Sequence, residues 1–188
     1  MQNDDMTEQQ KEIETIMERH IDIDLSDADV QRLCEKAGSV GLSVNELLRN
    51  FIGDLVHGTY TNGSDERDLA QQWFDRCWFG MFPDKTFLRY LIDWSFNVED
   101  IVQLWGLIKS TEKDLENTDE FDREDIDGMK EDLSYWKEDI NETFSEFQDW
   151  SKSEKIGTLD DEMATVLKWH EEMINIQKSG SSSSVKEN

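Results

Sequence analysis

Histidine, cysteine and proline are scarce in this sequence of 188 residues, and their scarcity excludes several kinds of function. The three histidines are His20, His57 and His170, and their wide separation leaves no HExxH motif and no histidine pair at i, i+4. A zinc site would need histidines and cysteines clustered at short spacing. Walker loops, GxGxxG motifs and GxSxG motifs are absent as well. We therefore expect no metal, no cofactor and no enzymatic activity.

The two cysteines and the lack of long apolar runs indicate the compartment. Cys34 and Cys77 both fall on apolar faces of predicted helices, which favours buried free thiols in a reducing compartment over a disulfide. No apolar run approaches the roughly 18 residues of a membrane span, and residues 1–19 are too acidic and polar for a signal peptide. The sequence predicts a cytoplasmic protein without a membrane segment.

Basic residues are few compared with acidic ones. Nineteen lysines and arginines stand against forty-four aspartates and glutamates, which gives a net charge of −25. Solubility alone requires a net charge with a magnitude of only roughly 2–8 in a small domain. The charge disfavours direct binding to nucleic acid, and a basic protein surface is its natural complement. The seven Trp and nine Phe argue against a disordered chain, and we expect them to fill the core of a compact helical domain.

Residues 20–25 alternate between polar and apolar side chains. The polar ones are His20, Asp22 and Asp24, and the apolar ones are Ile21, Ile23 and Leu25. A period of two is typical of a short strand with one buried face. We therefore predict a half-buried strand.

Two helices are predicted directly after this strand. Ser26 stands at an N-cap position, and the apolar residues of the first helix follow at i, i+3, i+4 and i+7: Val30, Leu33, Cys34 and Ala37. Gly38 and Gly41 end it. Ser43 and Glu46 then have the spacing of a capping box, which opens a second helix with the apolar face Leu47, Leu48, Phe51, Ile52, Leu55 and Val56.

A strand, a helix, a glycine turn and a capped helix within about 36 residues resemble the ribbon-helix-helix module of Arc- and MetJ-type repressors and of many antitoxins. The sequence GLSVNELLR is the closest match. The resemblance implies a homodimer through Ile21, Ile23 and Leu25, because the strand of that family pairs with its copy. It also implies that His20, Asp22 and Asp24 form the DNA-reading face, and that the amides of Ser43, Val44 and Asn45 bind a phosphate.

The reading face departs from the family's chemistry. Carboxylates facing a phosphate-lined groove are repelled, whereas a base reader needs Arg, Lys, Asn or Gln. The resemblance therefore favours the fold and disfavours direct DNA binding. A plain helical hairpin with a preceding turn is the alternative for the same residues.

The remaining segments organise the chain into an acidic arm at residues 1–19, the module at 20–57, an acidic helical domain at 64–178 and a flexible tail at 179–188. Residues 57–67 are rich in Gly, Asn and Ser, and predict a linker. Further helices are expected to start at Ser64 and after the caps Asp84, Asn97 and Thr158. The predicted fold class is mainly α, with a ribbon-helix-helix-like module followed by a multi-helix domain.

Residues 111–150 combine extreme charge with a helical pattern. They contain sixteen acidic and four basic residues, whereas Met129, Leu133, Trp136, Ile140, Phe144 and Phe147 keep a three-four spacing. We predict a helical hairpin that turns near residues 119–127. Each arm would be about 30 Å long, which places roughly one acid per 1.9 Å of length against one charge per 1.7 Å in duplex DNA.

This similarity of charge density predicts that the acidic side chains imitate nucleic acid. The residues expected to contact a partner are Asp114, Glu116, Asp119, Glu120, Asp122, Glu124, Asp125, Asp127, Glu131, Asp132, Glu138 and Asp139. A solvated face without a partner is the alternative.

Two hypotheses about function follow. In the first, the small size, the acidity and the lack of catalytic motifs resemble acidic anti-CRISPR and anti-restriction inhibitors of mobile elements, and a Cas9-type nuclease with its long basic channel is the favoured partner. In the second, the module is a ribbon-helix-helix antitoxin or transcriptional regulator, which binds DNA and uses its acidic helices for a basic protein. The orientation of Asp22 and Asp24 discriminates between them. If both side chains face outward, DNA binding by the ribbon is disfavoured; if the register shifts by one residue, the isoleucines face outward and the module assignment fails.

Overall fold

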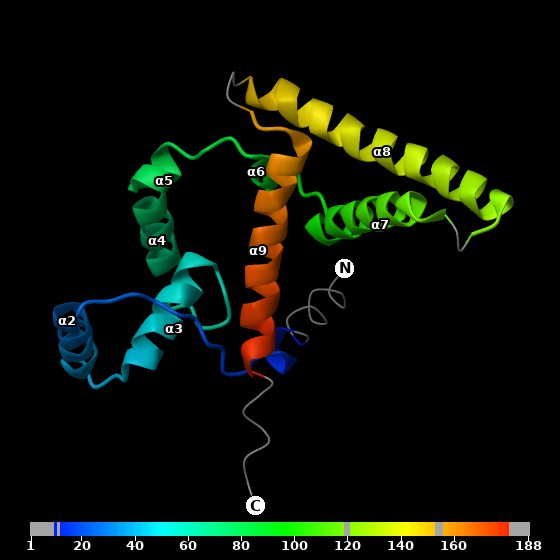
Figure 1. Ribbon diagram of the computed structural model, residues 1–188. Helices are drawn as coiled ribbons and strands as arrows, with labels where there is room; N and C mark the ends of the chain where they lie inside the picture. The colour runs from blue at the N-terminus through cyan, green and yellow to red at the C-terminus, as the bar shows by residue number, and fades with distance from the viewer. Residues whose placement is uncertain (1–9, 11, 119–120, 153–155, 181–188) are drawn as a thin grey trace, which may run out of the picture. The chain divides into compact units, whose positions relative to one another are not determined.

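The computed structural model describes residues 10, 12–118, 121–152 and 156–180, and in this part of the chain the regular structure is helical, without a β-strand (Figure 1). The helices are α2 (Asp27–Gly38), α3 (Val44–Leu55), α4 (Ser64–Arg76), α5 (Trp78–Met81), α6 (Phe87–Asp93), α7 (Val98–Glu116), α8 (Arg123–Ser151) and α9 (Leu159–Ser179). The prediction of a mainly α-helical protein is confirmed.

The chain divides into two compact units. Unit 1 comprises Met1–Pro83 and Ile176–Asn188, and unit 2 comprises Asp84–Asn175. The division falls at the single proline of the chain, whereas the sequence placed the start of the acidic helical domain at residue 64. Helices α4 and α5 therefore belong with α2 and α3 in unit 1.

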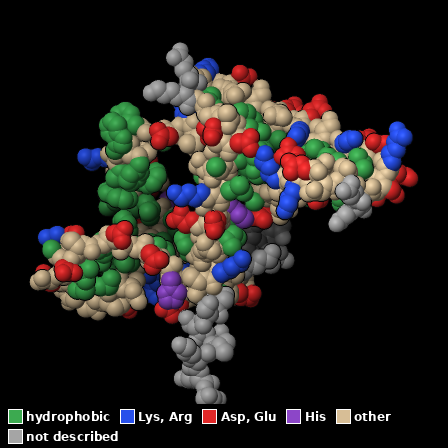
Figure 2. Space-filling model, viewed as in Figure 1, with side chains coloured by type: hydrophobic (Ala, Val, Ile, Leu, Met, Phe, Trp, Pro, Cys, Tyr) green, Lys and Arg blue, Asp and Glu red, His purple; other side chains and the backbone are tan. Residues whose placement is uncertain are grey.

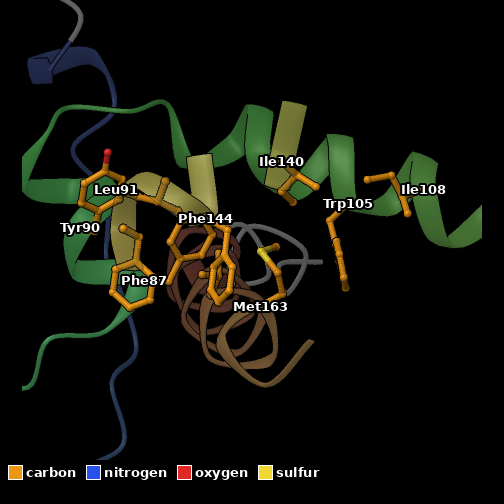
Figure 3. Packing of buried hydrophobic residues seen from close by; sticks show 10 residues of the cluster. Phe87, Tyr90, Leu91, Trp105, Ile108, Ile140, Phe144 and Met163 are labelled. Atoms are coloured by element: carbon orange, nitrogen blue, oxygen red, sulfur yellow. The ribbon is translucent and has the colours of Figure 1, made fainter. Parts of the chain in front are cut away.

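The hydrophobic core of unit 2 lies among α6, α7, α8 and α9 (Figure 3). Phe87, Leu91 and Phe147 are completely buried. The ring of Phe87 meets that of Phe144 edge to face, with 5.5 Å between centroids. Burial of one such side chain contributes about 1.5–3 kcal/mol. Phe87, Tyr90, Trp105, Phe144 and Phe147 thus fill a core, as the composition predicted.

Side-chain caps fix most of the helix starts. The side chain of Ser26 accepts a hydrogen bond from the amide of Asp29 at the start of α2, and that of Asn97 accepts one from Glu99 at the start of α7. Thr158 and Asp161 exchange hydrogen bonds before α9. Each bond satisfies an amide that the first helical turn leaves without a partner. These three predicted caps are confirmed.

The predicted cap at Asp84 is wrong, because α6 starts two residues later. Its N-cap is Thr86, whose hydroxyl accepts from the amide of Arg89 at 3.2 Å. The amide of Phe87 donates to the carboxylate of Glu162 on α9, at 2.9 Å. Packing of Phe87 in the core and the carboxylate from α9 together set this helix start, and neither is visible in the local sequence.

Residues 20–25 are not assigned to a strand in the described part of the chain. Ile21, Ile23 and Leu25 are 54%, 62% and 49% exposed, and the polar residues between them are exposed too. A ribbon needs a second strand to pair its backbone groups, and the described residues of a single chain supply none. The amide of His20 donates to the hydroxyl of Ser179, which joins the segment to the end of α9 within unit 1.

The expectation of buried thiols is wrong. Cys34 is exposed and Cys77 is partly exposed, and both are free. Helix α2 buries Ala37 instead of Cys34. Burial in unit 1 is therefore slight even where the helical pattern is correct.

Candidate partner-binding surface

Helix α8 presents a buried stripe to the core of unit 2 and carboxylates to solvent. Its stripe contains Met129, Leu133, Trp136, Ile140, Phe144 and Phe147, of which the last three reach full or near-full burial. The predicted apolar face is therefore confirmed. Because the stripe fixes the rotation of the helix, it also fixes the direction of every other side chain on α8.

Ten carboxylates cover the exposed side of α8, and together they form what we term the acidic ridge: Glu124, Asp125, Asp127, Glu131, Asp132, Glu138, Asp139, Glu142, Glu146 and Asp149. All ten residues are exposed. Figure 2 shows red side chains along this helix. Within the described residues, none of these carboxylates forms an ion pair.

The ridge consists of two rows. Since successive helical residues turn by about 100°, six of its acids lie directly opposite the buried stripe: Glu124, Asp127, Glu131, Glu138, Glu142 and Asp149. The other four recur every seven residues along one flank: Asp125, Asp132, Asp139 and Glu146. A seven-residue spacing keeps side chains on nearly the same line of a helix.

The three basic residues of α8 lie on the opposite flank. Arg123, Lys130 and Lys137 are also seven residues apart. The ammonium of Lys137 lies 2.6 Å from a carboxylate oxygen of Glu112 on α7. Helix α8 therefore carries its basic and its acidic residues on different faces. The last basic residue, Lys137, binds the neighbouring helix α7, and the acidic residues face solvent.

Helices α7 and α8 are joined by a short network of charges. Glu112 also lies 3.5 Å from Lys109, which is 2.9 Å from Asp160 at the start of α9. The hydrogen bond from Lys137 lowers the pKa of Glu112, and the hydrogen bond to Asp160 raises the pKa of Lys109. Lys109 also stands over the ring of Trp105, 4.3 Å from its centroid. The network holds α8 and its ridge against the core.

The dimensions of the ridge differ from the predicted hairpin. Residues 111–116 are the end of α7, and α8 alone contains 29 residues, a length of about 44 Å at 1.5 Å per residue. Its ten acids give roughly one charge per 4.4 Å, which is closer to the 3.4 Å spacing of one nucleic acid strand than to the 1.7 Å of a duplex. Helix α7, with 19 residues, is about 29 Å long and close to the expected arm of about 30 Å. Helix α8 is longer than expected, because the turn between the two helices lies near the start of residues 111–150 and not at their middle.

The other predicted contact residues lie between these helices or beyond the described residues. Asp114 and Glu116 are exposed near the end of α7. Asp122 caps α8, with its carboxylate accepting from the amide of Asp125 at 2.9 Å. Asp119 and Glu120 lie outside the described residues.

Three acids that belong to the ridge were left out of the predicted contact set. Glu142, Glu146 and Asp149 continue its two rows into the last turns of α8. Their spacing of three, four and seven from earlier acids was the signal that could have found them. Glu146 also accepts a hydrogen bond from the hydroxyl of Tyr90 at 3.0 Å, and burial together with this bond raises the pKa of Tyr90.

No family model, curated protein or solved structure matches this chain. Within the described residues, no helix is long and apolar enough to cross a membrane, and no group of three or more His, Cys, Asp or Glu residues is arranged to hold a metal ion.

The predicted phosphate site at the start of α3 already contains a carboxylate. The amide and hydroxyl of Ser43 both donate to Glu46, at 2.8 and 2.7 Å, and the amide of Glu46 donates back to Ser43. The capping box is confirmed. A phosphate near Val44 and Asn45 would have to approach this anionic side chain, which offsets the attraction of the helix N-terminus.

Proposed function

We propose that this protein is a non-enzymatic inhibitor, carried by a phage or another mobile element, that places its acidic ridge in the basic nucleic-acid channel of a host defence nuclease. The observation that supports the proposal is the separation of charge on α8, where ten carboxylates face solvent and the basic residues share a different flank. A Cas9-type nuclease is the favoured target because its channel holds nucleic acid through backbone charge and shape.

Rigidity makes the ridge suited to this role. Helix α8 is held by the buried side chains Ile140, Phe144 and Phe147, and by the ion pair between Lys137 and Glu112. The carboxylates are therefore spaced before the partner arrives, which reduces the entropy lost on binding. A basic channel would exchange its counterions for these carboxylates as it does for phosphates.

The test is inhibition of DNA cleavage by a purified Cas9-type nuclease with its guide RNA. Glu131→Gln, Glu138→Gln and Glu142→Gln together remove three charges from the row opposite the buried stripe and leave the stripe intact. The matched control removes three exposed charges from unit 1, through Glu35→Gln, Glu66→Gln and Asp68→Asn.

We expect the ridge variant to inhibit more weakly and with a shallower salt dependence, because fewer counterions are exchanged on binding. The control variant should inhibit like the wild type. If both variants lose inhibition equally, the total charge of the protein determines inhibition and the acidic ridge has no specific role. If the wild-type protein does not inhibit this nuclease, the nuclease is not the target.

A ribbon-helix-helix antitoxin or regulator is the alternative function. The exposed apolar side chains of Ile21, Ile23 and Leu25 favour it, because they are free to pair with the same segment of a second copy. A capped helix pair, α2 and α3, follows them as the module requires. Electrophoretic mobility shift on duplex DNA tests this function: a sequence-specific shift that Ile23→Glu abolishes, because the charge prevents two copies of the segment from pairing, would support it, and no shift at low salt would reject it.

A further inference from the structure

Unit 1 buries very little apolar surface of its own. Among its described residues, the buried hydrophobic side chains are Ala37 and Ala70, whereas the large buried side chains belong to unit 2. A small domain is stable only if it removes enough apolar area from water. Unit 1 therefore gains stability if a partner covers its exposed apolar surface.

Such a surface runs over α4 and α5, and we term it the α4–α5 apolar face: Leu69, Trp73, Phe74, Trp78, Phe79, Met81 and Phe82. Figure 2 shows hydrophobic side chains gathered over these two helices. The exposed fractions range from 41% for Phe74 to 77% for Trp78. With about 150–250 Å² for a whole aromatic side chain, the face exposes on the order of 800 Å².

This area matches a protein interface. The largest apolar patch on an ordinary monomer is about 300–600 Å², whereas each partner in a standard interface buries about 800 Å². The face is also preassembled, because its rings contact one another. Trp78 and Phe82 have centroids 4.5 Å apart, and Phe74 and Phe79 have centroids 5.3 Å apart.

The charge of the face differs from that of the rest of the molecule. Residues 69–82 contain one acidic and one basic residue, Asp75 and Arg76, in a chain whose net charge is −25. Two copies of this protein repel each other at their acidic surfaces, but they can meet at this locally neutral face without that repulsion. A second, negatively charged copy of the protein can therefore bind at the α4–α5 apolar face, whereas electrostatic repulsion disfavours its binding at α8.

A shallow pocket lies within the face. It has a volume of about 440 Å³ and is lined by Leu69, Gln72, Trp73, Arg76 and Cys77. Trp78 is the most exposed large hydrophobic side chain in the described part of the chain. A tryptophan ring fits a pocket of this size, and Arg76, which is one of its lining residues, would stabilise the ring through its guanidinium.

We infer that the α4–α5 apolar face is a homodimer interface, in which two copies meet about a two-fold axis and each inserts Trp78 into the pocket of the other. A two-fold interface uses the same surface on both copies, so one chain supplies both the protruding ring and the pocket. A second copy of the chain is also present wherever the protein is made. It can therefore stabilise unit 1, which has no large core of its own, by covering its apolar surface. The inference does not depend on the proposed function.

The test is the molar mass of the full-length protein by light scattering and sedimentation equilibrium at micromolar concentration. We expect twice the mass of one chain. Trp78→Glu or Phe82→Glu places a charge in the interface and should raise the dimer dissociation constant by about 30-fold or more, as for an interface hot spot. Because Trp78 and Phe82 are exposed in the single chain, circular dichroism should show an unchanged helix content.

Two control variants distinguish this interface from others. Tyr135→Glu changes an aromatic side chain on α8 that is 70% exposed, and it should leave the dimer intact. Ile23→Glu tests the ribbon pairing implied by the family resemblance, and it should also leave the dimer intact. A dimer that Ile23→Glu abolishes and Trp78→Glu does not would overturn the inference, as would a monomeric wild type.

Thiol reactivity supplies an independent measurement in the unmodified protein. Cys77 lines the pocket, whereas Cys34 is exposed on α2. As protein concentration rises and the dimer forms, alkylation of Cys77 should slow relative to that of Cys34. Trp78→Glu should restore the Cys77 rate. A constant ratio of the two rates at all concentrations would contradict the interface.

Discussion

The ammonium nitrogen of Lys137 on α8 lies 2.6 Å from a carboxylate oxygen of Glu112 on α7. Lys137 is the last residue of the basic flank of α8, so its ion pair turns that flank toward α7. The same rotation directs the acidic ridge to solvent. One contact between two helices therefore links the packing of unit 2 to the surface that we propose binds a partner.

The first prediction concerns the pH dependence of stability. Because Lys137 lowers the folded-state pKa of Glu112 below its ordinary value of 4.5, the pair contributes stability above that value and loses it as the pH falls through the lowered pKa. Glu112→Gln should lower the thermal midpoint at neutral pH, by the equivalent of under about 1 kcal/mol for a partly exposed pair. The difference from wild type should vanish in acid.

Thermal unfolding followed by circular dichroism across the acidic range checks this prediction. Glu116→Gln is the matched control, since Glu116 is exposed near the end of the same helix and has no ion pair within the described residues. It should show little change at any pH. A Glu112→Gln deficit that persists at low pH would show that the side chain acts by packing and not by charge.

The second prediction concerns the core of unit 2. Phe147 is completely buried and its ring lies 5.4 Å from that of Phe87. Phe147→Ala leaves a cavity and should lower the free energy of unfolding by about 3–5 kcal/mol. Chemical denaturation measures it. Tyr135→Ala on the exposed side of α8 should change the same quantity by less than about 0.5 kcal/mol, and similar losses in both variants would contradict the described rotation of the helix.

The third prediction compares two helical glycines. A β-carbon on Gly53 would collide with the backbone carbonyl of Tyr60, whereas one on Gly106 meets no atom within 4 Å. Gly53→Ala should therefore destabilise the protein by about 1–3 kcal/mol. Gly106→Ala in α7 should stabilise it by about 0.5–1 kcal/mol, because alanine is the better helix former. Opposite signs in denaturant midpoints would confirm the close approach of α3 to residue 60.

Asp54, the residue after Gly53, forms hydrogen bonds with the same loop. The carboxylate of Asp54 accepts hydrogen bonds from the hydroxyl of Thr61 and the amide of Asn62, at 2.9 and 2.7 Å. These bonds attach the loop after α3 to the helix and lower the pKa of Asp54. Asp54→Asn should therefore destabilise unit 1 most at neutral pH, and the loss should diminish as the pH falls through the lowered pKa of the wild-type carboxylate.

Features decided by neighbouring residues were predictable from the sequence. The caps at Ser26, Ser43 and Asn97 depend on a side chain and an amide two or three residues apart, and all three are present. The buried stripe of α8 was also correct, since a three-four spacing over many turns has one interpretation. Seven of the ten ridge acids were in the predicted set for the same reason, whereas Glu142, Glu146 and Asp149 were missed.

Features decided by distant residues were not predictable. Thr86 replaces Asp84 as a cap because Phe87 packs in the core and binds Glu162, 75 residues away. The extent of α7 and α8 depends on their packing, so the charge density of the ridge came out lower than predicted. Trp73 and Phe74 have the helical spacing of core residues, yet they remain 47% and 41% exposed, because the rings that they contact in unit 1, Phe51 and Phe79, cover only part of their surface.

Competition with nucleic acid is the most direct test of the central claim that the acidic ridge occupies a nucleic-acid channel. Fluorescence anisotropy of a labelled DNA strand bound to the purified Cas9-type nuclease and its guide measures displacement. Wild-type protein should release the strand, and Glu131→Gln, Glu138→Gln and Glu142→Gln together should weaken this release. A complex in which the protein and the strand are bound to the nuclease at the same time, each with undiminished affinity, would contradict the claim.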